Sequence, residues 1–112
     1  MRSFSPAAVV FADPTAVKEQ TPAFQKYIFV CENVRKDGVC CMPEGERIRE
    51  ELKSRVKASG LSSKIRVSRA GCLDVCGQGP NVLVMPDDRW YSGVAVQDVE
   101  AILAQTLRGV RE

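Results

Sequence analysis

Five cysteines constrain this 112-residue chain more than any other feature, because they fall into two separate groups. The first group is Cys31 with the adjacent pair Cys40 and Cys41, and the second is Cys72 with Cys76. The sequence contains no histidine, so a metal site would have to use thiolates, carboxylates or backbone atoms. Four soft thiolates suit zinc or an iron–sulfur cluster and exclude the usual imidazole-based sites.

Glycine and proline surround the second group of cysteines. Residues 70–80 read AGCLDVCGQGP, with a glycine before the first cysteine and another directly after the second. A loop that wraps closely around a cluster needs backbone angles that glycine tolerates, and it lets N–H groups approach the sulfurs. Such N–H···S contacts stabilise a reduced iron–sulfur cluster. A Cys-x3-Cys pair alone is a weak signal, but this glycine-rich setting with thiols upstream is a strong one.

Four short segments have the composition or the polar–apolar alternation of β-strands: 26–31, 64–69, 81–86 and 89–92. Asp87 and Asp88 separate the last two segments and predict a turn, hence a hairpin. Cys31 closes the first segment. Loops at the ends of neighbouring strands can bring separated thiols together at one edge of a sheet.

Two segments have the period of amphipathic helices. In 44–58 the apolar positions recur every four residues, and Gly60 marks the stop. From Val96 onward one helical face would carry four apolar residues: Val99, Ile102, Leu103 and Leu107. The predicted order is β-α-β-β-β-α, an α+β or α/β domain with one sheet covered by two helices and the cysteine loops at one end.

Residues 1–24 differ from the rest of the chain. They contain Pro6, Pro14 and Pro22 and no sustained apolar period. We therefore expect residues 1–24 to be a disordered or loosely packed extension, followed by one domain at 25–112.

Charge and hydropathy exclude several classes of protein. The net charge of +2 is too small to indicate nucleic-acid binding. No run approaches the roughly 20 apolar residues of a membrane span, and the apolar run at 7–12 is shorter than the core of a typical secretory signal. These features favour a cytoplasmic protein without membrane insertion. In a reducing compartment the cysteines would bind metal or do redox chemistry rather than form structural disulfides.

Several segments together resemble the thioredoxin-like [2Fe-2S] ferredoxins. They are IFVC at 28–31, GVC at 38–40, GCLDVCGQGPNVLVMP at 71–86 and the pair WY at 90–91. The resemblance covers roughly residues 26–108. It implies a truncated thioredoxin-type fold that holds one [2Fe-2S] cluster through four cysteines, usually in a homodimer.

Carried over to this chain, the resemblance implies the cluster ligands Cys31, Cys40, Cys72 and Cys76. The chain departs from the family in a shorter loop between the first two ligands and in the doubled cysteine at 40–41. Cys41 therefore stays open as an alternative to Cys40. The triplet GVC at 38–40 and the offsets to the apolar positions of the following helix favour Cys40, whereas counting from Cys41 aligns Gly45 with a small residue common in the family.

The resulting prediction is a one-electron carrier that exchanges electrons with redox proteins, and not an enzyme, because no acid–base pair or substrate pocket can be recognised. Two alternatives stay open: a cluster-bearing accessory subunit of a larger oxidoreductase, and a four-cysteine zinc or thiol redox module. We expect a homodimer through the hairpin region at 82–92, where Trp90 and Tyr91 lie on an exposed strand. Those residues, with Tyr27 and Phe29, are expected in the sheet core or in dimer packing.

Overall fold

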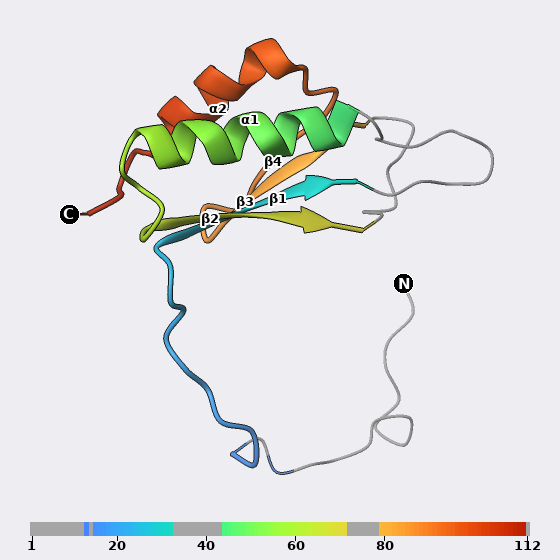
Figure 1. Cartoon of the computed structure of the whole chain (residues 1–112). Helices are drawn as coiled ribbons and strands as arrows, with labels where there is room; N and C mark the ends of the chain where they lie inside the picture. The colour runs from blue at the N-terminus through green and yellow to red at the C-terminus, as the bar shows by residue number, and fades with distance from the viewer. Residues whose placement is uncertain (1–12, 14, 33–43, 72–78, 112) are drawn as a thin grey trace, which may run out of the picture.

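The computed structural model describes residues 13, 15–32, 44–71 and 79–111. In these residues a single sheet carries two α-helices on one face (Figure 1). The elements are β1 (Lys26–Cys31), α1 (Glu44–Ala58), β2 (Ile65–Ala70), β3 (Val82–Met85), β4 (Arg89–Tyr91), the 3-10 helix η3 (Val96–Asp98) and α2 (Val99–Thr106). The predicted order β-α-β-β-β-α is confirmed, with strand bounds that differ from the prediction by a residue or two.

The sheet has the strand order β2-β1-β3-β4. β1 and β2 are parallel, from Lys26 opposite Ile65 to Cys31 opposite Ala70. β3 is antiparallel to both of its neighbours. Because β1 and β2 are parallel, their carboxyl ends lie at the same edge of the sheet. The chain segments that follow both strands therefore leave from one place.

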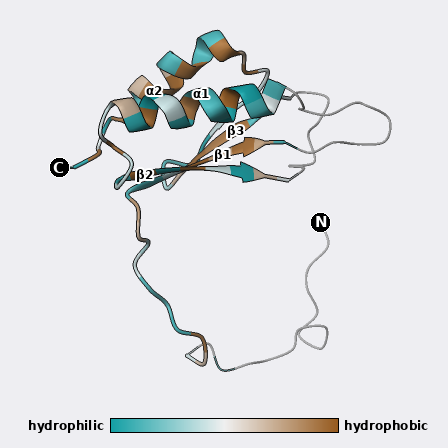
Figure 2. Ribbon diagram, in the orientation of Figure 1, coloured by the Kyte–Doolittle hydropathy of each residue, from teal (hydrophilic) through white to brown (hydrophobic). Residues whose placement is uncertain are grey.

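The core lies between the sheet and the helices. On α1 the predicted positions Ile48, Leu52 and Val56 are buried, and Gly60 takes a φ of +72° just after the helix, as expected for a glycine stop. In Figure 2 apolar residues run along β1 and β3, and the visible side of α1 is mostly hydrophilic. Four strand residues complete the centre of the core and are fully buried: Ile28, Val30, Val82 and Val84.

The C-terminal helix departs from the prediction at one position. Val99, Ile102 and Leu103 are buried as expected. The expectation for Leu107 is wrong, because it lies beyond the end of α2 and is 38% exposed. Thr106 is buried instead, and its hydroxyl donates to the Ile102 carbonyl at 2.7 Å. A threonine can occupy this buried place because the preceding turn of its own helix supplies the acceptor.

The face of the sheet opposite the helices is uncovered within the described part of the chain (Figure 1). Strand alternation places Tyr27 and Phe29 on this face. The register adds Leu83, Met85 and Trp90. Trp90 is 46% exposed and Met85 38% exposed. We call these five residues the apolar patch, and its size is more than scattered surface residues would give.

The two aromatic residues of β4 point to opposite faces. Trp90 belongs to the apolar patch, whereas Tyr91 lies opposite Val82, on the helix side of the sheet. The Tyr91 hydroxyl hydrogen-bonds to Gln105 of α2. Exposure of both aromatics was expected, but Tyr91 is half-buried under α2.

The packed domain begins near residue 24. The Phe24 ring meets Tyr27 edge-on at a centroid distance of 5.7 Å. The Gln25 side chain donates to the Arg111 carbonyl and accepts from the Arg111 N–H, both at 2.6 Å. Residues 15–22 are exposed and form neither helix nor strand. The division into 1–24 and 25–112 nevertheless stays a prediction. Within the described residues, no helix has the length and hydropathy needed to cross a membrane.

Candidate metal centre

Of the predicted cluster ligands, Cys31 lies in the described structure, and Cys40, Cys41, Cys72 and Cys76 lie outside the described residues. Cys31 is the last residue of β1 and is fully buried. Within the described residues no three potential metal ligands come together. The described structure therefore shows the frame around one predicted ligand.

Cys31 is fixed by the strands on both sides. Its N–H donates to the Asn81 carbonyl at 3.0 Å, just before β3 begins. The N–H of Glu32, the next residue, donates to the Ala70 carbonyl at 3.1 Å, where β2 ends. The backbone at Cys31 thus joins the end of β2 and the beginning of β3.

The start of α1 packs against the same point. A β-carbon built on Gly45 would lie 2.1 Å from the Cys31 carbonyl oxygen, which is closer than any real side chain approaches. Glycine therefore lets the first turn of α1 rest on the last peptide of β1. A glycine inside a helix is unfavourable by about 1 kcal/mol relative to alanine. That penalty in the first turn of a strong helix is the signal by which Gly45 could have been found.

The ends of both cysteine-bearing segments therefore meet at one edge of the sheet. Segment 33–43 connects Glu32 to Glu44, at the start of α1. Segment 72–78 connects Gly71, just after β2, to Gly79, two residues before Asn81. The hydrogen bonds and the close packing at Cys31 hold these four ends together.

A buried amide lies next to Cys31. Asn81 is fully buried, and its Oδ1 accepts hydrogen bonds from Trp90 Nε1 at 3.1 Å and from Ser92 Oγ at 2.9 Å. The sequence analysis placed Asn81 in a strand but not in the site. The only hint in the sequence was a strongly polar residue at the head of an apolar strand.

An ion pair lies directly behind Cys31. The Glu32 side chain, 2% exposed, accepts a hydrogen bond from Nε of Arg49, which is 18% exposed. This hydrogen bond to Glu32 raises the pKa of Arg49 above its ordinary value of 12.5, so the guanidinium stays charged. The pair ties α1 to the end of β1 and places one positive and one negative group near the predicted ligand.

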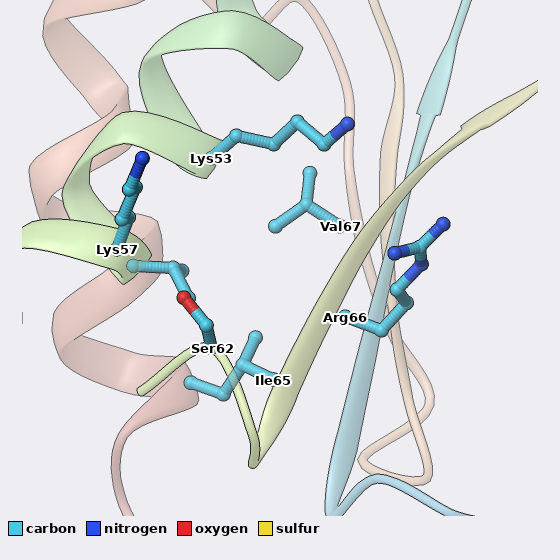
Figure 3. A pocket seen from close by; sticks show the side chains of 7 residues that line it. Lys53, Lys57, Ser62, Ile65, Arg66 and Val67 are labelled. Atoms are coloured by element: carbon cyan, nitrogen blue, oxygen red, sulfur yellow. The ribbon is translucent and has the colours of Figure 1, made fainter. Parts of the chain in front are cut away.

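A separate pocket of about 290 Å³ lies between α1 and β2. In Figure 3, Lys53 and Lys57 extend from α1 beside it, while the side chain of Arg66 lies on the other side of β2. Its described lining contains cationic and apolar residues and no carboxylate. Ile65, which begins β2, lines it, so the pocket lies away from the end of β2 that meets Cys31.

Comparison with known proteins shows what the frame belongs to. Over 81 residues the chain is 36% identical to a 2Fe-2S ferredoxin of Clostridium pasteurianum, an alignment that covers 69% of this chain and 79% of that protein. The solved thioredoxin-like [2Fe-2S] ferredoxin of Aquifex aeolicus matches it with a TM-score of 0.68 at 28% identity, over 78% of this chain and 89% of that chain. The chain belongs to the thioredoxin-like [2Fe-2S] ferredoxins.

Other comparisons agree with this assignment. A 2Fe-2S ferredoxin of Aquifex aeolicus is 28% identical over 89 residues, covering 75% of this chain and 80% of that protein. No family model matches the chain. The predicted thioredoxin-like fold and the [2Fe-2S] cofactor are confirmed by these relatives. Ferredoxins are electron-transfer proteins, so this ferredoxin carries electrons to and from redox partners.

The residues of the chain fit such a cluster. Thiolates are the ligands that hold [2Fe-2S] clusters. The sequence offers five cysteines and no histidine. The buried end of β1, with N–H groups and ion-paired side chains around Cys31, supplies a rigid and largely dry frame.

Proposed function

We propose that this ferredoxin moves single electrons between redox proteins with its cluster held by Cys31, Cys40, Cys72 and Cys76. The observation that supports this ligand set is the junction at Cys31. Segments 33–43 and 72–78 carry the other cysteines, and both begin and end at that junction. Short segments anchored at both ends keep their cysteines within reach of Cys31.

The relatives support the second pair of ligands. Two solved structures of the Aquifex aeolicus ferredoxin are Cys-to-Ser variants at positions four residues apart, each with a TM-score of 0.67 to this chain. Cys72 and Cys76 have the same spacing. We infer that this pair occupies the corresponding loop.

Between the adjacent cysteines we propose Cys40 as the ligand. Neighbouring residues on an extended backbone point their side chains to opposite sides, so the two cannot serve equally without a shift of the loop. The triplet GVC at 38–40 favours Cys40. In this proposal Cys41 is a thiol near the cluster that binds no iron.

When bound, the cluster takes up and releases one electron with little change in its geometry. The chain contributes the frame around it. β1 holds Cys31 in place through backbone hydrogen bonds, and burial keeps water away from its sulfur. A site built on strands moves little between redox states, which favours fast electron exchange.

We also propose a cytoplasmic homodimer that forms through the apolar patch. Trp90 and Met85 are the most open members of the patch, and both belong to the hairpin region at 82–92. A second copy would cover this side of the sheet and the edge strand β4. The described part of Arg66 and Ser68 on β2 makes the same face polar toward its other edge.

Counting electrons tests the proposed function. In a spectroelectrochemical titration of the purified protein we expect reversible bleaching of visible bands with one electron per chain. A dithiol–disulfide module would take two electrons without visible bands, and a zinc module would take none. Either result would contradict the proposal. Constant co-purification with a larger oxidoreductase, with no electron exchange by the separated chain, would instead favour the accessory subunit.

A further inference from the structure

Asn81 lies directly across the sheet from Cys31. The register pairs Val30 with Val82, so the next pair along is Cys31 with Asn81, whose backbones share the 3.0 Å hydrogen bond. Opposing residues of an antiparallel pair carry their side chains on the same face, with Cβ atoms about 5 Å apart. The buried amide is therefore the cross-strand neighbour of the predicted ligand.

The hydrogen bonds of Asn81 fix the orientation of its amide. An indole N–H can only donate, so the atom that faces Trp90 Nε1 must be the amide oxygen. Ser92 Oγ binds the same oxygen. Both donors come from β4 and the residue after it, on one side of β3, while Cys31 lies on the other side. The oxygen and nitrogen of a planar amide point apart, so Nδ2 points away from β4, toward the β1 side.

We propose that the Asn81 side-chain amide donates an N–H to the Cys31 sulfur and thereby raises the reduction potential of the cluster. The inference rests on the proposed role of Cys31 as a ligand. The reduced cluster carries more negative charge on its sulfurs, so a donor stabilises the reduced form more than the oxidised form. Trp90 and Ser92 act as positioning residues, because they hold the oxygen and so direct the nitrogen.

Three variants separate this role from simple support of the fold. Asn81→Leu removes the donor and adds no charge. Asn81→Val does the same with a side chain that suits a strand better, in case the first variant does not load a cluster. Trp90→Phe keeps the ring and removes one of the two groups that hold the amide oxygen. Tyr91→Phe is the matched control, since it removes a hydroxyl from the same hairpin whose partner, Gln105, lies on the other face.

The measurement is the midpoint potential of the loaded protein, together with its EPR spectrum. At the wild-type midpoint, we expect either Asn81 variant to lower the ratio of reduced to oxidised cluster by about tenfold, equivalent to 59 mV for one electron. Trp90→Phe should lower the ratio by less, because Ser92 still binds the oxygen. Tyr91→Phe should leave the ratio unchanged.

Two different failures can be told apart. Loaded Asn81 variants with the wild-type potential, even if they lose the cluster sooner, would overturn the inference and leave the ligand set intact. A Cys31→Ser variant that keeps a cluster with the wild-type spectrum and potential would instead overturn the proposed ligand. That variant is measured in the same series.

Discussion

Gly45 and Cys31 lie in contact through their backbones, so closely that a β-carbon on Gly45 would come within 2.1 Å of the Cys31 carbonyl oxygen. This contact sets the position of α1 on the sheet. It also brings the start of α1 to the junction of β1, β2 and β3. Its removal should therefore affect both the stability of the fold and the retention of the cluster.

Gly45→Ala tests this contact. In an ordinary helix the change would stabilise the protein. Here the methyl group collides with backbone, and we expect a loss of about 1–3 kcal/mol in the free energy of unfolding, as for overpacked cores, and faster loss of the visible spectrum. Ser54→Ala, at an exposed position of the same helix, is the control and should be neutral. Equal stability of the two variants would show that the contact is not needed.

The buried ion pair gives a second prediction. Arg49→Met leaves the Glu32 carboxylate buried without its partner, and breaking such a pair typically destabilises a protein by about 3–5 kcal/mol. Denaturant unfolding measures the difference. Arg47→Met is the control, because Arg47 pairs with Glu44 at the surface, where both side chains are more than half exposed. Such surface pairs contribute about 0–1 kcal/mol.

The pH dependence of that pair follows from its arginine. Glu32 raises the pKa of Arg49 above 12.5, so the stabilisation is fully present below the unfolded value and is lost only at higher pH. The stability difference between wild type and Arg49→Met should therefore stay constant from about pH 6 to about pH 10. A difference that disappears within this range would contradict the assignment.

The sequence predicted the local elements well because their signals are local. The four-residue period of Ile48, Leu52 and Val56 and the β-forming runs each require only neighbouring residues. Leu107 failed because periodicity cannot show where a helix ends, and Thr106 replaced it because its own helix supplies an acceptor.

The surroundings of the site could not be predicted in the same way. The Glu32–Arg49 and Asn81–Trp90 contacts join residues far apart in sequence or on different strands. They depend on strand order and register, which no local pattern contains. Cys31 could be placed because a cysteine at the end of an apolar run carries its own signal.

Serine substitutions at the adjacent cysteines test the choice of ligand. Cys41→Ser should keep the cluster and its spectrum almost unchanged. Cys40→Ser should lose the cluster or recruit Cys41 with a shifted spectrum and potential, because a one-residue slip near a helix start costs little. Visible absorption and EPR of both variants decide the matter. A cluster lost in Cys41→Ser and intact in Cys40→Ser would show that Cys41 is the ligand.

The proposed dimer predicts the effect of a charge in the apolar patch. Met85→Lys should convert the protein to a monomer in sedimentation analysis at micromolar concentration, because it buries an unpaired charge in the interface. Leu107→Lys is the matched control, since Leu107 has the same 38% exposure but lies after α2. A wild-type protein that is already monomeric under these conditions would rule out the dimer.

Iron and acid-labile sulfide analysis of anaerobically purified protein, with an EPR spectrum after reduction, tests the central claim most directly. The protein should contain two irons and two sulfides per chain, as its relatives' 2Fe-2S designation implies, and the reduced form should give the signal of a one-electron-reduced cluster. Stoichiometric zinc without labile sulfide, in protein produced with adequate iron, would contradict it.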